Sequence, residues 1–165
     1  MRLQDIGYQI RQARLERGLT QAQLAQAAKV SRTTLNQLEN GLFPDLGVKK
    51  LRAILDQLGL TLIIQSTEKT AAPDFVRMAC TTANVSYRDV LSEDELIRAL
   101  LTGKIPVGKR PHFRTLLDEA APALLQGLAQ EVSRWTKPGR LERNLDMIAK
   151  DINSKRGVGT WLKTG

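Results

Sequence analysis

The sequence predicts an all-α protein, and three observations lead to this fold class. Apolar residues recur at helical spacing in both halves of the 165-residue chain, hydroxyl or proline residues suited to helix starts precede most of these stretches, and only residues 60–65 alternate with the period of a β-strand. The polar segment QSTEKTAAP, residues 65–73, interrupts the helical periodicity. We therefore expect two helical domains, residues 1–66 and 74–153, joined by a linker over residues 67–73.

Four helices are predicted in the first domain, because residues that can cap a helix and glycines that can end one bracket its apolar stretches. In chain order these are a helix that ends at Gly18, residues 21–28 after Thr20, residues 32–40 between Ser31 and Gly41, and residues 48–58 before Gly59. Only Lys29 and Val30 separate the second helix from the third. Two short helices joined by such a tight turn form a helix-turn-helix candidate.

The segment LTLIIQ that follows is predicted to be a short strand, because its side chains alternate and include β-branched residues. A lone strand leaves its backbone N–H and C=O groups unpaired, so we expect it to pair with its copy in a second subunit. The predicted dimerisation residues are Leu60, Leu62, Ile63 and Ile64. A fifth short helix or an extended arm is the alternative.

Helices are also predicted throughout the second domain. Ser92 and Glu95 form a capping box before a helix that ends at Gly103, and prolines open further helices over residues 111–119, 122–135 and 138–153. Residues 154–165 are basic, contain glycine and lack periodicity, so we expect a flexible tail. Trp161 within this tail is predicted to anchor a partner protein.

The third helix carries the residues that indicate a function. At 100° per residue, one arc of this helix is polar, whereas Leu35 and Leu38 lie on the opposite side. The polar arc consists of Arg32, Thr33, Asn36, Gln37 and Asn40. An arginine can read guanine, and an asparagine or glutamine can read adenine, in the major groove of DNA. The alternative is an ordinary solvated face of a surface helix.

The segment QARLERGLTQAQLAQAAKVSRTTLNQLENG, together with the later LRAILDQLGL, resembles the Xre/Cro family of helix-turn-helix domains over residues 5–65. The resemblance implies a lambda-repressor-like fold in which Arg32, Thr33, Asn36 and Gln37 occupy positions that contact bases and backbone; Asn40 is predicted to bind DNA beside them. The resemblance also implies that Gln21 approaches a DNA phosphate and that Glu39 pairs with Arg14 as a structural ion pair.

The composition agrees with a nucleic-acid partner. The chain has 25 Lys+Arg against 17 Asp+Glu, a net charge of +8 that favours polyanions. The expected function is a dimeric repressor that binds double-stranded DNA at a palindromic operator, in the bacterial cytoplasm and at the nucleoid when bound. The alternatives are an antitoxin that neutralises a co-expressed toxin through its second half, and a repressor with an added dimerisation or ligand-sensing domain.

An enzymatic function is not expected. Cys80 and His112 could in principle form a nucleophile and its base, but Cys80 follows an apolar run and His112 lies in the basic segment KRPHFR. The sequence contains no phosphate loop, paired-histidine metal motif or nucleophile elbow. We therefore expect no cofactor, no metal and no membrane partner. The longer segment KIPVGKRPHFR, residues 104–114, is basic as well. It either contacts DNA or an acidic partner or is a solvated loop.

Overall fold

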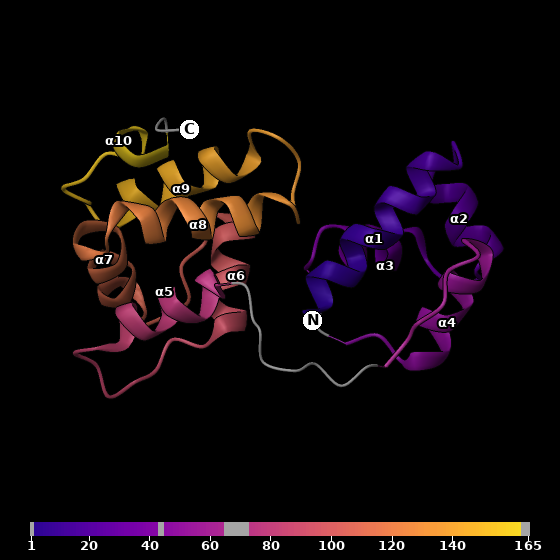
Figure 1. Cartoon of the computed structure of the whole chain (residues 1–165), viewed down its shortest axis with the longest axis horizontal. Helices are drawn as coiled ribbons and strands as arrows, with labels where there is room; N and C mark the ends of the chain where they lie inside the picture. Colours follow the sequence, from indigo (N-terminus) through magenta and orange to yellow (C-terminus); the bar gives the residue numbers. More distant parts are fainter. Residues whose placement is uncertain (1, 43–44, 65–72, 163–165) are drawn as a thin grey trace. The chain divides into compact units, whose positions relative to one another are not determined.

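The structure, a computed structural model, consists of α-helices joined by turns and loops wherever the chain is described (Figure 1). The all-α prediction is confirmed for this part of the chain. The chain divides into two compact units, Met1–Thr70 and Ala71–Gly165. The predicted linker, residues 67–73, lies outside the described residues except for Pro73. The described stretches are residues 2–42, 45–64 and 73–162.

The first unit contains the four helices that the sequence predicts. Thr20 and Ser31 cap the second and third as expected, because their hydroxyl oxygens accept hydrogen bonds from the backbone N–H groups of Gln23 at 3.2 Å and Thr34 at 3.0 Å. The helices are α1 (Leu3–Glu16), α2 (Gln21–Ala27), α3 (Arg32–Glu39) and α4 (Val48–Gln57).

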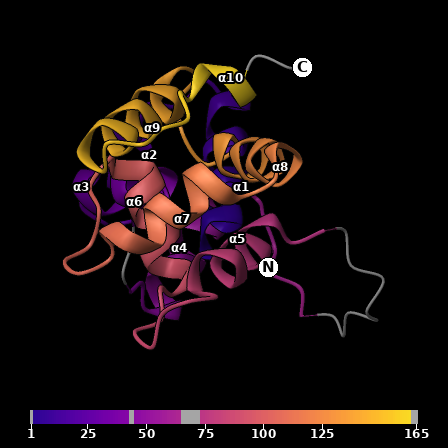
Figure 2. The same ribbon diagram turned by 90° about the vertical axis from the view of Figure 1, so that its left-hand side faces the viewer.

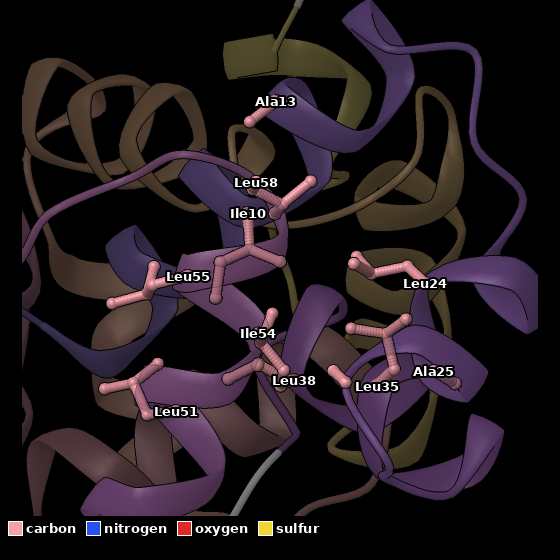
Figure 3. Packing of buried hydrophobic residues seen from close by; sticks show 11 residues of the cluster. Ile10, Ala13, Leu24, Ala25, Leu35, Leu38, Leu51, Ile54, Leu55 and Leu58 are labelled. Carbon is pink, nitrogen blue, oxygen red and sulfur yellow. The ribbon is translucent and has the colours of Figure 1, made fainter.

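Aliphatic side chains from all four helices form one core, which Figure 3 shows from close by. Ile10 of α1, Leu35 of α3 and Ile54 of α4 are fully buried in it. Helix α1 approaches α3 so closely that a Cβ on Gly7 would lie 2.0 Å from the carbonyl oxygen of Leu38. Only glycine fits at this position, and the close contact holds α3 against the rest of the unit.

The predicted strand after α4 is wrong for this chain, because the described residues contain no strand. The N–H of Leu60 instead donates to the carbonyl oxygen of Leu55 at 2.9 Å and closes the end of α4. Residues 61–64 adopt no regular structure. Alternation describes which faces the side chains occupy, but a strand also needs a neighbour for its backbone groups, and the described part of this chain supplies none.

The second unit is a helical bundle in which α8 packs against α5 and α10, and α6 packs against α9 (Figures 1 and 2). The helix α5 was not predicted, although Asp74 caps it by accepting a hydrogen bond from the N–H of Arg77 at 2.9 Å. The helices are α5 (Phe75–Asn84), α6 (Glu93–Thr102), α7 (Arg110–Glu119), α8 (Pro122–Ser133), α9 (Arg140–Asp151) and α10 (Gly159–Leu162).

The prediction of a flexible tail is wrong for residues 154–162. A carboxylate oxygen of Asp118 accepts hydrogen bonds from the hydroxyl of Ser154 at 2.6 Å and the N–H of Lys155 at 3.0 Å. Helix α10 follows and inserts Trp161, which is 2% exposed, among apolar residues of α7, α8 and α9. Trp161 is therefore part of the bundle core and not an exposed anchor for a partner.

Candidate nucleic-acid interface

Helix α3 separates its side chains into a buried and an exposed face. Leu35 and Leu38 are 0% and 1% exposed and belong to the core of the first unit. The side chains of Arg32, Thr33 and Gln37 are exposed and have no hydrogen-bond or ion-pair partner among the described residues. The predicted polar arc therefore presents free donor and acceptor groups on the surface of this unit.

The turn before α3 fixes how this helix follows α2. Lys29 adopts the left-handed backbone conformation, with φ of 54°, and the N–H of Val30 then donates to the carbonyl oxygen of Ala25 at 2.9 Å. A residue other than glycine is strained in this conformation. The turn is thus short and well defined, and it leaves the Lys29 side chain exposed beside the N-terminus of α3.

The structure contains the predicted ion pair between Arg14 of α1 and Glu39 of α3. The guanidinium donates to both carboxylate oxygens, from Nε at 2.6 Å and Nη2 at 2.9 Å, and Nη1 donates to the carbonyl oxygen of Leu19 at 2.7 Å. The side chains of Arg14 and Glu39 are only 9% and 1% exposed. This bidentate pair ties the end of α3 to α1.

Gln21, the first residue of α2, belongs to the same network. Its Nε2 donates to Glu39 Oε2 at 2.8 Å, so the carboxylate joins α1, α2 and α3. The sequence predicts only a contact between Gln21 and a DNA phosphate and gives no sign of this bond to Glu39. The half-buried side chain retains one amide hydrogen and its oxygen, so the predicted phosphate contact stays a prediction.

Asn40 differs from the other residues of the polar arc, because its amide bonds back to the helix. Asn40 Nδ2 donates to the backbone oxygen of Asn36 at 2.7 Å and to Asn36 Oδ1 at 2.6 Å. Asn36 is exposed and Asn40 half-buried. Asn36 thus remains on the outer face of α3, whereas the side chain of Asn40 is hydrogen-bonded to Asn36.

Further cations lie on the surface of the first unit. Lys49 and Lys50 are exposed in the first turn of α4, where they can neutralise phosphate charge. Phe43 and Pro44, which precede this helix, lie outside the described residues.

Several chemically reactive or basic residues of the second unit are buried or paired within it. Cys80 is 7% exposed, and His112 Nε2 donates to the carbonyl oxygen of Asp89 at 2.5 Å. A hydrogen bond from Lys109, whose Nζ lies 2.7 Å from Asp89 Oδ1, lowers the pKa of that carboxyl. Arg110, also in the basic segment, pairs with Asp151 at 2.6 Å.

The part of the chain that the structure describes contains no group of three or more His, Cys, Asp or Glu residues placed to hold a metal ion. None of its helices is long and apolar enough to cross a lipid bilayer.

Two capped helices joined by a tight turn, with the second helix exposing a polar face, define a helix-turn-helix unit. Residues 10–64 match the family model described as helix-turn-helix, so this segment is an Xre and lambda-repressor-like domain. It binds double-stranded DNA, and the chain that carries it is a DNA-binding transcription regulator. No curated protein and no solved structure matched the chain.

Proposed function

We propose that this protein is a repressor that binds a palindromic operator as a homodimer. The observation that carries the proposal is the outer face of α3, where Arg32, Thr33 and Gln37 are exposed and free of partners in the described residues. Guanidinium and amide groups on a helix that enters the major groove can discriminate between base pairs, each good contact contributing about 1–3 kcal/mol.

The architecture around α3 supports a reading role rather than a merely solvated face. The buried Arg14–Glu39 pair, the Gly7 contact and the capped N-terminus all fix the helix in place. A rigid helix enters a groove without a further ordering cost, whereas a loosely held one would lose binding energy on docking.

An exposed apolar surface beyond α4 supports the homodimer. Leu62, Ile63 and Ile64 are 45%, 68% and 94% exposed, and Val48 at the start of α4 is 76% exposed. Grooves of about 320 and 380 Å³ lie beside this segment, against α4 and α1. A contiguous apolar patch of this kind is typical of a protein–protein contact. In this proposal a second copy covers the patch, so that the dimer carries two α3 helices, one for each half-site.

The dimer has its own test in Ile63→Asp. The variant places a charge in the apolar surface, so we expect sedimentation equilibrium of the full chain to change from dimer to monomer. Binding to a palindromic duplex then weakens more than binding to a single half-site. A variant that remains dimeric would show that this surface is not the interface.

DNA recognition is tested with the full chain and a library of randomised duplexes. We expect selection to return a symmetric motif whose half-sites are about one helical turn apart, or a multiple of that distance. Arg32→Ala and Gln37→Ala should each relax the preference at one position of each half-site. The matched controls are Arg143→Ala and Gln57→Ala, which change exposed residues of α9 and α4. Equal loss of affinity for all sequences would contradict base reading.

Salt dependence separates the phosphate contacts from the base contacts. Each neutralised phosphate steepens the fall of log K against log salt by about 0.9. Lys49→Ala should therefore reduce the salt slope and leave the selected motif unchanged. A changed motif would mean that Lys49 reaches base edges.

An antitoxin role is the second candidate, and the separate second unit is the observation that favours it. This unit has its own buried core. Val85, Val90 and Val107 are 77%, 61% and 101% exposed on its loops and offer apolar contacts to a partner. The test is whether the product of the neighbouring reading frame co-purifies with the full chain and loses its toxicity. Absence of such a partner would leave the repressor proposal alone.

The proposal assigns no catalytic step to the chain. The buried thiol of Cys80 and the engaged imidazole of His112 support this assignment. Cys80→Ala and His112→Asn variants that fold should keep the full DNA affinity and repression of the wild type. A variant that keeps its fold and its DNA affinity but loses an enzymatic activity of the wild type would contradict this assignment.

A further inference from the structure

The orientation of the Asn36 side-chain amide is settled by its neighbour Asn40. Two atoms of Asn36 lie within hydrogen-bond distance of Asn40 Nδ2, namely the backbone oxygen at 2.7 Å and Oδ1 at 2.6 Å. The backbone oxygen is an acceptor only, so the Asn40 atom beside it must be the nitrogen. This nitrogen is a donor only, so the atom of Asn36 that it meets must be the amide oxygen. The backbone carbonyl of Asn36 therefore fixes the orientation of both side-chain amides, that of Asn40 and that of Asn36.

This bond determines which chemistry Asn36 offers to the solvent. Its Oδ1 is held toward Asn40, one turn further along α3, and one of its lone pairs is already used. Nδ2 keeps both hydrogens, since no described residue accepts from it. Asn36 thus presents two donors at the exposed face of the helix, with its acceptor turned back.

The sequence alone favours adenine for an asparagine at this position, because adenine offers an acceptor at N7 and a donor at N6 to one planar amide. That pairing requires the amide oxygen and nitrogen to face the base together. Guanine offers two acceptors, N7 and O6, and suits a group that presents only donors. We propose that Asn40 is a positioning residue that holds Asn36 as a donor and so selects guanine, not adenine, at the base that Asn36 meets.

This inference rests on the proposed function, because it requires α3 to lie in the major groove. The full chain is first assayed with the selected duplex, and the position read by Asn36 is the one at which Asn36→Ala loses discrimination. Fluorescence anisotropy then gives the affinity for guanine and for adenine at that position. We expect wild type to prefer guanine by about fivefold or more, the lower range of a good side-chain contact to a base.

Two variants of Asn40 make opposite changes to the amide of its neighbour. Asn40→Ala removes the donor and frees Asn36 to rotate, so the preference for guanine over adenine should fall to about twofold or less, with other positions unchanged. Asn40→Asp is isosteric, but its carboxylate can only accept. It therefore loses the bond to the backbone oxygen of Asn36, and any hydrogen bond that it keeps with Asn36 must come from Nδ2. That bond would turn Oδ1 outward and move the preference toward adenine. The unfolding transition of each variant verifies that it folds.

The outcomes separate this inference from the proposed function. A wild-type preference for adenine at the Asn36 position overturns the inference. So does an Asn40→Ala variant whose ratio of guanine affinity to adenine affinity equals that of wild type. If Asn36→Ala weakens binding to all duplexes equally, Asn36 holds a phosphate, and the inference fails while the proposed function stands through Gln37. If wild type shows no sequence preference at any position, both fail together.

Discussion

Replacement of Arg14 by methionine tests the buried network that holds α3. Arg14 donates two hydrogen bonds to Glu39 and one to the carbonyl oxygen of Leu19, and methionine keeps the apolar length of the side chain without any of them. The Glu39 side chain is 1% exposed, so its carboxylate would remain buried with only Gln21 as a donor among the contacts described above. Loss of one partner from a buried pair costs about 3–5 kcal/mol, and we expect that loss here.

The assay uses the uneven placement of tryptophan in the chain. Both tryptophans, Trp135 and Trp161, belong to the second unit, so their fluorescence during urea unfolding reports on that unit alone. Far-ultraviolet circular dichroism reports on the helices of both units. We therefore expect Arg14→Met to lower the circular dichroism midpoint of the first unit while the fluorescence midpoint stays within error of wild type.

A double variant separates the buried charge from the packing. Arg14→Met combined with Glu39→Leu removes both charges and should recover all but about 1 kcal/mol of the loss, because no unpaired carboxylate remains. A cost below about 1 kcal/mol for Arg14→Met alone would refute the reasoning, since the pair would then contribute no more than an exposed one. An equal shift of the fluorescence midpoint would refute it as well.

The same two signals test the close helix contacts and the acid sensitivity of the second unit. Gly7→Ala would place a Cβ 2.0 Å from the carbonyl oxygen of Leu38, so it should destabilise the first unit by about 1–3 kcal/mol, seen in circular dichroism and not in fluorescence. Gly127→Ala would place a Cβ 2.3 Å from the Phe75 ring and should lower the fluorescence midpoint instead; an unchanged midpoint would mean that α5 and α8 can separate freely. Burial raises the pKa of Asp118, but hydrogen bonds from Ser154 and the following backbone outweigh it, and the net pKa is lowered. The stabilisation by this carboxylate is therefore present above the unfolded pKa of about 3.9 and is lost as the pH falls through the lower folded pKa. Asp118→Asn should thus flatten the loss of fluorescence-detected stability in acid, and an identical acid profile would contradict this.

The helices of the first unit could be predicted because their signals are local. Thr20 and Ser31 cap helices through backbone groups three residues away, and the apolar spacing between them identifies the buried face. The separation of Leu35 and Leu38 from the polar arc of α3 follows from helical geometry alone. Such features do not depend on the rest of the chain, so the sequence contains them directly.

Features that depend on distant contacts were predicted poorly. The segment after α4 alternates as a strand does, but alternation carries no information about a backbone partner. Residues 154–162 lack periodicity, yet Asp118 fixes them through bonds that join positions far apart in the chain. Trp161 is buried because these bonds hold the segment against the bundle. The pattern of residues within the tail carries no sign of that burial.

The candidate site shows the same limit at the level of single atoms. The spacing of Asn36 and Asn40 places them on neighbouring turns of α3, but it does not say which atom of each amide faces the other. Gln21 likewise bonds to Glu39, 18 positions further along the chain, across the turn at Lys29 that joins α2 and α3. Identity and spacing therefore located the surface, whereas the direction of its donors required the structure.

The most direct measurement is photo-crosslinking from the outer face of α3. The full chain with a photoreactive amino acid in place of Gln37 is bound to its selected duplex and irradiated, and Gln57 on α4 carries the same group in the control protein. Contact between α3 and base edges predicts a crosslink to bases within each half-site from position 37 and none from position 57. Crosslinks only from position 57, or none from either while the duplex remains bound, would contradict DNA recognition by this helix.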